Sequence, residues 1–198
     1  LRVRLVEEGV LESFQALEGY RFGDYTSGLR ILIPPDSLVN GSGNAYKGEA
    51  LITHTVLNLQ GKGGAAVPGD LLGVGPSGDP KPLTAFASIV FDLQSSGGIP
   101  LFLAPGASVS LELPVGEESI LAEGASVPGW IYDDTEGAYR AAISSVVSQS
   151  SLLSDVKTVS LTVNSLAPWV VARPTGGAWL SGTVPAGGGE ALVGGAVR

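Results

Sequence analysis

The sequence predicts an all-β fold, a two-layer antiparallel β-sandwich with short strands and Gly/Pro-rich loops. Two features of the composition support it. The 29 Gly and 13 Pro among 198 residues interrupt helices, and a hydrophobic content of 44% is enough for a sizeable core. The third observation is a recurring alternation of apolar and polar residues, which is the period of a half-buried strand. We expect roughly nine or ten strands.

The N-terminal segment begins with a strand and continues with an ambiguous stretch. Residues 1–6 read LRVRLV, which alternates and predicts an outer strand. Residues 7–18 fit either a turn of helix or a pair of strands, because apolar residues recur at helical spacing while Gly9 interrupts them. Both alternatives stay open here.

Two further strands flank a polar connection. Residues 28–33 alternate and end at Pro34-Pro35, because proline cannot donate to a strand ladder. Residues 39–48 are polar, and residues 49–60 form the longest strand candidate. We expect 49–60 to pair with 28–33.

Residues 61–82 form a breaker-rich connection with a short apolar strand near 71–74. It contains a formal G-x-G-x-x-G at Gly73, Gly75 and Gly78. A phosphate-cradling loop requires a helix to start there, but the neighbouring prolines indicate a turn. We interpret the motif as a turn between strands.

The middle of the chain predicts a buried strand at 83–93, with Phe86 and Phe91 on opposite faces. Shorter strands follow at 99–103 and 108–113.

A β-hairpin is expected at 127–142, VPGWIYDDTEGAYRAA. Trp130 and Tyr132 are two residues apart and share one strand face, and an acidic turn separates them from Tyr139 and Ala141 on the returning strand. The hairpin therefore predicts an aromatic centre for the sandwich.

The last strands are expected at 156–163, which alternates strictly, and at 169–171. The composition changes at Pro174. We therefore predict a β-sandwich domain over 1–174, followed over 175–198 by a Gly-rich linker or the beginning of a second β-repeat.

Several of these stretches resemble known extracellular β-domains. SGLRILIPPDSL at 27–38 and GEALITHTVLNL at 48–59 resemble the opening of ZU5-type β-domains. The segments LFLAPGASVSLELP, VPGWIYDDTEGAYRAA and SLAPWVVARP are similar to the extracellular region of the FAM171 (astroprincin) family. The resemblance spans about residues 25 to 174 and implies an extracellular β-domain.

The tail carries a second resemblance. GGAWLSGTVPAGGGEALVGGAVR is similar to the opening of a carboxypeptidase-regulatory-like repeat, in which a strand precedes a Gly-rich turn. This resemblance implies tandem domains in a longer polypeptide.

Charge and residue usage narrow the function classes. A net charge of −8 predicts no nucleic-acid partner, because the phosphate backbone would be repelled. The absence of cysteine excludes disulfides and thiolate chemistry. No apolar run approaches the ~20 residues of a membrane span, so we expect no direct membrane insertion in this segment. No cofactor is expected.

His54 is the only histidine, so any Ser-His-Asp arrangement must use it. It shares a strand face with Ile52 and Val56, and no nucleophile elbow accompanies it. We expect a sheet histidine that is either hydrogen-bonded or exposed at an edge, and not a general base.

The turn carboxylates Asp133, Asp134 and Glu136 are weak candidates for a calcium site, because Ca²⁺ prefers oxygen ligands. Asp is also an ordinary turn residue, and a solvated turn is the favoured interpretation. A hydrolase with a carboxylate pair is a third functional class, which requires two carboxyls across a cleft.

Four aromatic residues could serve as a sugar-stacking platform, although aromatics at strand spacing usually fill a core. They are Trp130, Tyr132, Tyr139 and Trp169. Asn40-Gly41-Ser42 is an N-glycosylation sequon, which would be modified in a secreted chain.

The sequence therefore predicts a non-catalytic structural or adhesion module of a larger extracellular or cell-surface protein. Its expected partners are other domains of the same chain or protein subunits, and glycans in the alternative. That alternative is a carbohydrate-binding module that uses exposed aromatics.

Overall fold

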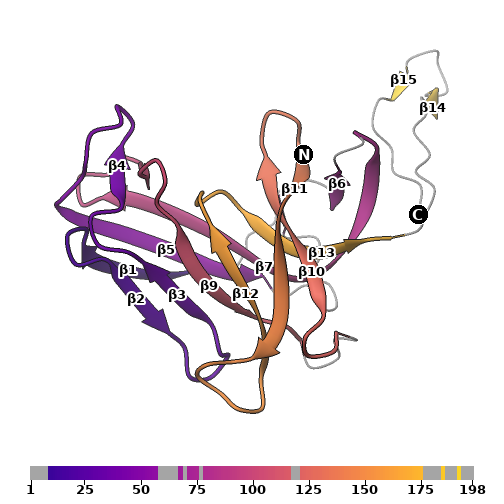
Figure 1. Ribbon diagram of the computed structural model, residues 1–198. Helices are drawn as coiled ribbons and strands as arrows, with labels where there is room; N and C mark the ends of the chain where they lie inside the picture. The colour runs from indigo at the N-terminus through magenta and orange to yellow at the C-terminus, as the bar shows by residue number, and fades with distance from the viewer. Residues whose placement is uncertain are drawn as a thin grey trace.

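The structure is a computed structural model that describes residues 9–57, 67–68, 71–75, 78–116, 121–175, 184–185 and 191–192. In these residues the regular elements are β-strands and none is a helix, which confirms the all-β prediction. Among them there is accordingly no helix long and apolar enough to cross a membrane. The strands form antiparallel sheets that pack together as a sandwich (Figure 1).

The described residues between 9 and 175 form thirteen strands. They are β1 (Val10–Gln15), β2 (Tyr20–Gly23), β3 (Arg30–Ile33), β4 (Leu38–Asn40), β5 (Glu49–Leu57), β6 (Leu72–Val74), β7 (Pro80–Ser95), β8 (Leu101–Leu103), β9 (Val109–Pro114), β10 (Ser126–Asp133), β11 (Ala138–Gln149), β12 (Lys157–Val163) and β13 (Trp169–Pro174). In the tail, β14 (Val184–Pro185) pairs with β15 (Ala191–Leu192). The strand predicted at 1–6 lies outside the described residues.

One continuous sheet holds most of these strands, in the order β1-β5-β7-β13-β10-β11-β12-β9-β3-β2. The strand β6 pairs with β7 and runs parallel to β11, and β4 and β8 form a separate small sheet. The sheet turns from one layer into the other at β11, which pairs with β10 between residues 138 and 146 and with β12 between residues 146 and 149. The two ends of the sheet are therefore β1 and β2.

The expected pairing of 28–33 with 49–60 is wrong. β3 pairs with β2 and β9, whereas β5 pairs with β1 and β7. Ile31 and Ile52 each have no exposed surface and belong to the same core cluster, which they enter from opposite layers. Apolar and polar residues alternate in both β3 and β5 because both strands face this core. The alternation does not show which strands are neighbours in the sheet.

In the described part of the ambiguous stretch, residues 9–18, β1 ends at Gln15 and a turn leads towards β2. The stretch is therefore one strand and a turn, and β1 pairs with β5 instead of with β2. The longest strand is β7, with 16 residues, and β5 has 9. The predicted strands near 71–74, 83–93, 99–103, 108–113, 156–163 and 169–171 are each present with shifted ends.

A second apolar cluster lies on the other face of the central strands. It contains Leu83, Trp130, Tyr139 and Val170, while Trp169 and Val171 belong to the main core. A register shift in the β13–β7 ladder pairs Val171 with Ala87 and Ala172 with Ala85, which leaves Phe86 as the extra residue.

This bulge overturns one prediction. Phe86 packs against the same core cluster that contains Phe91, although the two were expected on opposite faces. The extra residue reverses which side chains of β7 face which side of the sheet. Leu83 therefore packs in the second cluster, whereas Ile89 packs in the main core.

Candidate functional site

The β10–β11 hairpin has the register that its sequence predicts. Trp130 lies opposite Ala141, and Tyr132 lies opposite Tyr139. The rings of Tyr132 and Tyr139 are 5.2 Å apart with an interplanar angle of 59°. The hairpin aromatics therefore form the centre of the second cluster, and the prediction that they form the centre of the sandwich is wrong.

The aromatic platform is not formed. The exposed fraction is 3% for Trp130, 1% for Trp169 and 0% for Tyr139. The two indoles also belong to different clusters, and each donates its N–H to a backbone carbonyl: Trp130 to Ala172 at 3.0 Å and Trp169 to Ser165 at 2.9 Å. Buried rings on opposite faces of a sheet cannot stack on one sugar, so only the partly buried Tyr132 remains available for that role.

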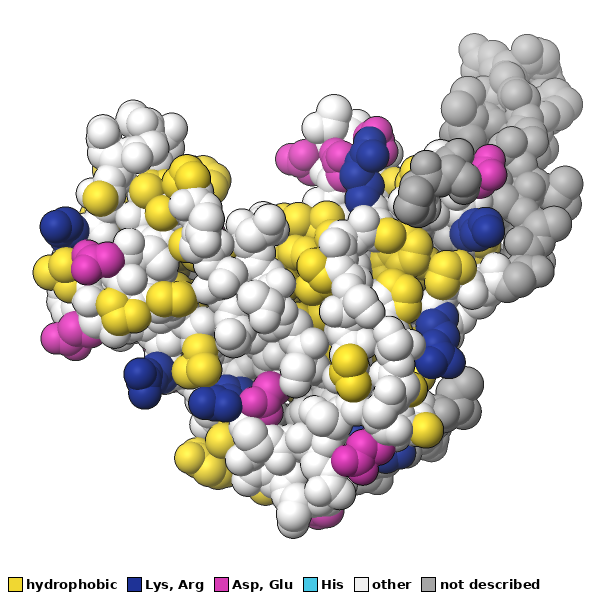
Figure 2. All heavy atoms as spheres, in the orientation of Figure 1, with side chains coloured by type: hydrophobic (Ala, Val, Ile, Leu, Met, Phe, Trp, Pro, Cys, Tyr) yellow, Lys and Arg dark blue, Asp and Glu magenta, His cyan; other side chains and the backbone are white. Residues whose placement is uncertain are grey.

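The acidic turn is held by Arg140. Its guanidinium donates to Asp133 Oδ2 at 2.9 Å and also pairs with Glu136. Asp133 Oδ1 accepts the backbone N–H groups of Thr135 and Glu136, at 3.0 and 3.2 Å. Figure 2 shows acidic and basic side chains together over this tip.

The carboxylates considered as calcium ligands already accept hydrogen bonds within the turn. The hydrogen bond from Arg140 lowers the pKa of Asp133, and Asp134 Oδ1 accepts from the Thr135 hydroxyl at 3.4 Å. In the described part of the chain no group of three acidic or histidine side chains is arranged to hold a metal ion. Arg140 thus supplies positive charge to the same carboxylates that were considered as calcium ligands.

Asn40 is the last residue of β4 and precedes an exposed turn. Its Oδ1 accepts the backbone N–H groups of Ser42 and Asn44, both at 3.0 Å. The following residues 41–45 are exposed. This arrangement fixes the carbonyl oxygen and leaves Nδ2 as the atom that glycosylation would modify.

In the described part of the G-x-G-x-x-G stretch, Gly73 lies on a strand and the Gly78 N–H donates to the Gly75 carbonyl at 3.0 Å. Gly73 belongs to β6, and Gly78 has a φ of +79°. The described residues around the motif form no helix, as expected. Gly73 has a packing role, because a Cβ there would lie 2.8 Å from Trp130 Cζ3.

His54 is buried at the seam between the two ends of the sheet. It is 2% exposed, and its ring lies 4.4 Å from that of Phe22 on β2. Neither ring nitrogen has a hydrogen-bond partner among the described residues, and burial lowers the pKa of the imidazole. On β1, Glu12 accepts a hydrogen bond from the Tyr20 hydroxyl at 3.0 Å, and its charge opposes that shift.

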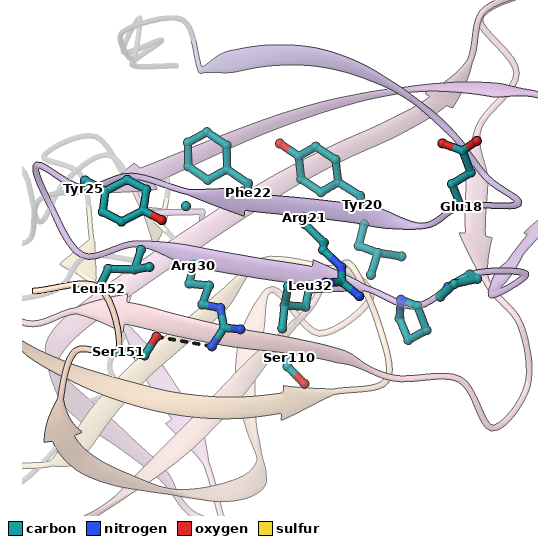
Figure 3. Close-up of a pocket in the computed structure, with 14 residues that line it drawn as sticks. Glu18, Tyr20, Arg21, Phe22, Tyr25, Arg30, Leu32, Ser110, Ser151 and Leu152 are labelled. Carbon is teal, nitrogen blue, oxygen red and sulfur yellow. Dashed lines mark hydrogen bonds between the residues drawn. The ribbon is translucent and has the colours of Figure 1, made fainter.

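A groove that the sequence did not indicate runs along β2, which we call the β2 groove. Its volume is about 780 Å³, and its lining includes Arg21, Tyr25, Arg30, Leu32, Ser110 and Leu152. Figure 3 shows Arg21 and Arg30 on the side of β2 and β3 that carries Ser110, with Tyr20 and Phe22 on the opposite side. The 70% exposed Tyr25 follows the end of β2.

A smaller hollow of about 560 Å³, the β8 hollow, lies beside β8 and the loop 164–168. Phe102, 52% exposed, and Tyr132 line it together with Asp134 and Asn164. Figure 2 shows hydrophobic side chains at the base of the notch between the β4 end and the hairpin tip. Two of the residues singled out in the sequence, Tyr132 and Asp134, thus meet here.

Both hollows are assembled from segments far apart in the chain, so no local sequence motif predicts them.

Comparisons with protein-family models, curated proteins and solved structures found no match to this chain.

Proposed function

We propose that this chain is a non-catalytic structural or adhesion module of a larger extracellular or cell-surface protein. It mediates assembly or spacing by contacting neighbouring domains or protein subunits through its sheet edges. The observation that carries the proposal is the end of the sheet at β2, which pairs only with β3 among the described strands and is flanked by the β2 groove.

The composition of that groove fits a protein partner. Protein interfaces are enriched in tyrosine and arginine, and their hot spots combine such residues with apolar pockets. Tyr25 and Arg21 are exposed here beside the partly buried Leu32. A strand edge adds backbone donors and acceptors that a partner can use.

The state of His54 supports a non-catalytic role. A nucleophile is activated by a base within hydrogen-bond reach, and in the described residues no hydroxyl is bonded to either ring nitrogen of His54. The extracellular placement rests on the resemblance of residues 25–174 to ZU5-like and astroprincin-like domains and on the exposed turn at Asn40.

A second candidate function is carbohydrate binding in the β8 hollow. Phe102 and Tyr132 offer ring surface, and Asp134 and Asn164 offer polar groups that sugars bind. This site differs from the predicted platform, since Tyr132 is the one residue common to both.

Cross-linking of the parent polypeptide on intact cells, read by mass spectrometry, tests the proposal against this alternative. We expect cross-links from Lys47, Lys81 or Lys157 to other domains or subunits and no binding of the chain to a glycan array. Array binding that Phe102→Ala abolishes, without such cross-links, would replace the proposal by the carbohydrate-binding function.

The extracellular placement has its own test. When the chain is expressed through a eukaryotic secretory pathway, we expect a glycan mass that a glycosidase removes. Asn40→Gln should eliminate this mass. An unmodified Asn40 in the secreted chain would show that the sequon is not used and gives no support to extracellular placement.

A further inference from the structure

We propose that the free edge of β2 binds an acidic peptide segment in extended conformation, which adds to the sheet as one more strand. The segment carries a carboxylate beside Arg21 and an apolar side chain beside Gly23. This inference rests on the proposed function, because it names the chemistry of the partner at the same edge.

The backbone of β2 presents the groups that such a strand needs. The Asp24 N–H donates to the Leu29 carbonyl at 2.9 Å, and the register continues with Gly23 opposite Arg30 and Phe22 opposite Ile31. In an antiparallel ladder alternate residues bond the partner strand. Phe22 therefore bonds β3, while the N–H and C=O groups of Arg21 and Gly23 point away from β3. No described strand pairs with β2 on that side.

The charge on this edge selects an acidic partner. The four described arginines are Arg21, Arg30, Arg140 and Arg173, and among them only Arg21 has no hydrogen-bond partner. Arg30, on the same face, is engaged by Glu112 at 3.1 Å and by Ser151 at 3.2 Å. The chain as a whole carries a net charge of −8, so Arg21 is a local positive group on an acidic molecule.

The geometry of strand addition puts the partner's carboxylate within reach. A residue directly opposite Arg21 on an added strand has its Cβ about 4.5–5.5 Å away on the same face. An Arg–carboxylate pair at that distance forms charge-assisted, often bidentate, hydrogen bonds. Glu18, at the other end of the groove, repels acidic residues there and limits where the carboxylate lies.

Gly23 makes room for the apolar residue. It has no side chain, and a Cβ at this position would lie 3.3 Å from Leu152 Cδ1 and 4.0 Å from Tyr25 Cε2. A side chain opposite Gly23 on the added strand thus meets an aliphatic group and an exposed ring. The predicted recognition element is an acidic and an apolar residue two positions apart.

An arginine on an edge strand also discourages promiscuous pairing with other sheets. That role is compatible with selective binding, because the same charge that repels basic strands favours an acidic one.

The test uses a fluorescein-labelled peptide, GTETVTG, and its lysine counterpart GTKTVTG, titrated with the full chain at low salt and followed by fluorescence anisotropy. We expect saturable binding of the glutamate peptide. Arg21→Glu should weaken it by about tenfold or more and make the lysine peptide the better ligand.

Arg173→Glu is the matched control, because it makes the same charge change on another surface and should leave the affinity within about twofold. Circular dichroism establishes that both variants are folded. A glutamate peptide N-methylated at alternate amides should bind poorly when the methyl groups face β2 and normally in the opposite register.

The absence of saturable binding, an equal effect of both charge reversals, or indifference to N-methylation in both registers would overturn the inference. If the peptide fails while cross-links from the module to other domains persist, the strand-addition site is wrong and the proposed function stands.

Discussion

At the residue scale, Gly73 allows the second cluster to pack closely because it has no side chain. A Cβ here would lie 2.7 Å from Leu83 Cδ2 and 2.8 Å from Trp130 Cζ3, so the cluster has no space for a methyl group. Overpacking of this kind costs about 1–3 kcal/mol, and we expect Gly73→Ala to lower the free energy of unfolding by that amount. Urea denaturation measures it.

Gly75 provides the control for that substitution, because a Cβ there would meet nothing within 4 Å. Gly75→Ala should change the stability by less than about 0.5 kcal/mol. Equal effects at both positions would contradict the packing role of Gly73.

Two buried tyrosines differ in whether the hydroxyl group has a hydrogen-bond partner. The Tyr139 hydroxyl is buried with no hydrogen-bond partner among the described residues, whereas the Tyr20 hydroxyl donates to Glu12. An unsatisfied buried polar group costs free energy, so Tyr139→Phe should leave the chain equally stable or stabilise it by about 1–2 kcal/mol.

Tyr20→Phe should instead destabilise the chain by about 1–2 kcal/mol, because Glu12 loses its donor. Thermal unfolding of the two variants compares these effects. A loss of stability in Tyr139→Phe equal to that in Tyr20→Phe would show that the Tyr139 hydroxyl has a partner.

At the scale of elements, the sequence predicted individual strands better than their neighbours. Alternation at 127–142 identifies which side chains share a face, and a tight turn fixes which residues are opposite, so the hairpin register follows from the chain itself. The β3 and β5 pairings could not follow, because they are set by how the layers close over the core. The bulge at Phe86 could not be predicted either, because no glycine or proline at this position indicates a break in the strand.

The β2–β3 turn depends on one carboxylate. Asp24 accepts hydrogen bonds from the Ser27 hydroxyl at 2.6 Å, from the Thr26 hydroxyl at 2.6 Å and from the Thr26 N–H at 2.8 Å. These bonds, with Ser27 contributing most, lower the pKa of Asp24 from 3.8 to about 2. The native turn therefore binds the Asp24 proton less readily than the unfolded chain does.

That difference predicts a pH dependence. The stabilisation by Asp24 is present above about pH 4 and is lost as the pH falls towards 2, because the carboxylate is protonated first in the unfolded chain. Unfolding midpoints at pH 4.5 and 2.5 should fall further in the wild type than in Asp24→Asn. Parallel declines in the two proteins would exclude the turn as the source.

At the scale of the whole molecule, the ends of the sheet meet through side chains and without a backbone ladder. Phe14 and Tyr20 have ring centroids 5.0 Å apart, and Phe22 contacts His54. Protonation of His54 would place a charge in this seam. Burial lowers the imidazole pKa below its ordinary 6.5, although the nearby Glu12 carboxylate opposes the shift.

Protonation of His54 therefore favours the unfolded chain. The unfolded chain takes up the His54 proton first, so stability is complete above about pH 6.5 and decreases below it, by as much as about 1.4 kcal/mol per pH unit. His54→Leu, of similar volume, should flatten the change between pH 7 and 5.5 in urea titrations. An unaltered slope in the variant would mean that His54 does not titrate in the native seam.

The candidate site was less predictable than the fold for a physical reason. The sequence drew attention to aromatic residues at strand spacing, and burial removed three of the four from any surface role. The β2 groove joins the chain near residue 21 to residues 110 and 152. These residues come together only when the layers fold. The sequence around Tyr25 and Arg21 does not indicate that their side chains are exposed.

The 12 residues of β11 belong to both layers at once. A load applied to one layer therefore reaches the other along a covalent chain, and the layers cannot slide apart while β11 keeps its bonds to β10 and β12. We therefore expect the two layers to unfold together in one cooperative transition.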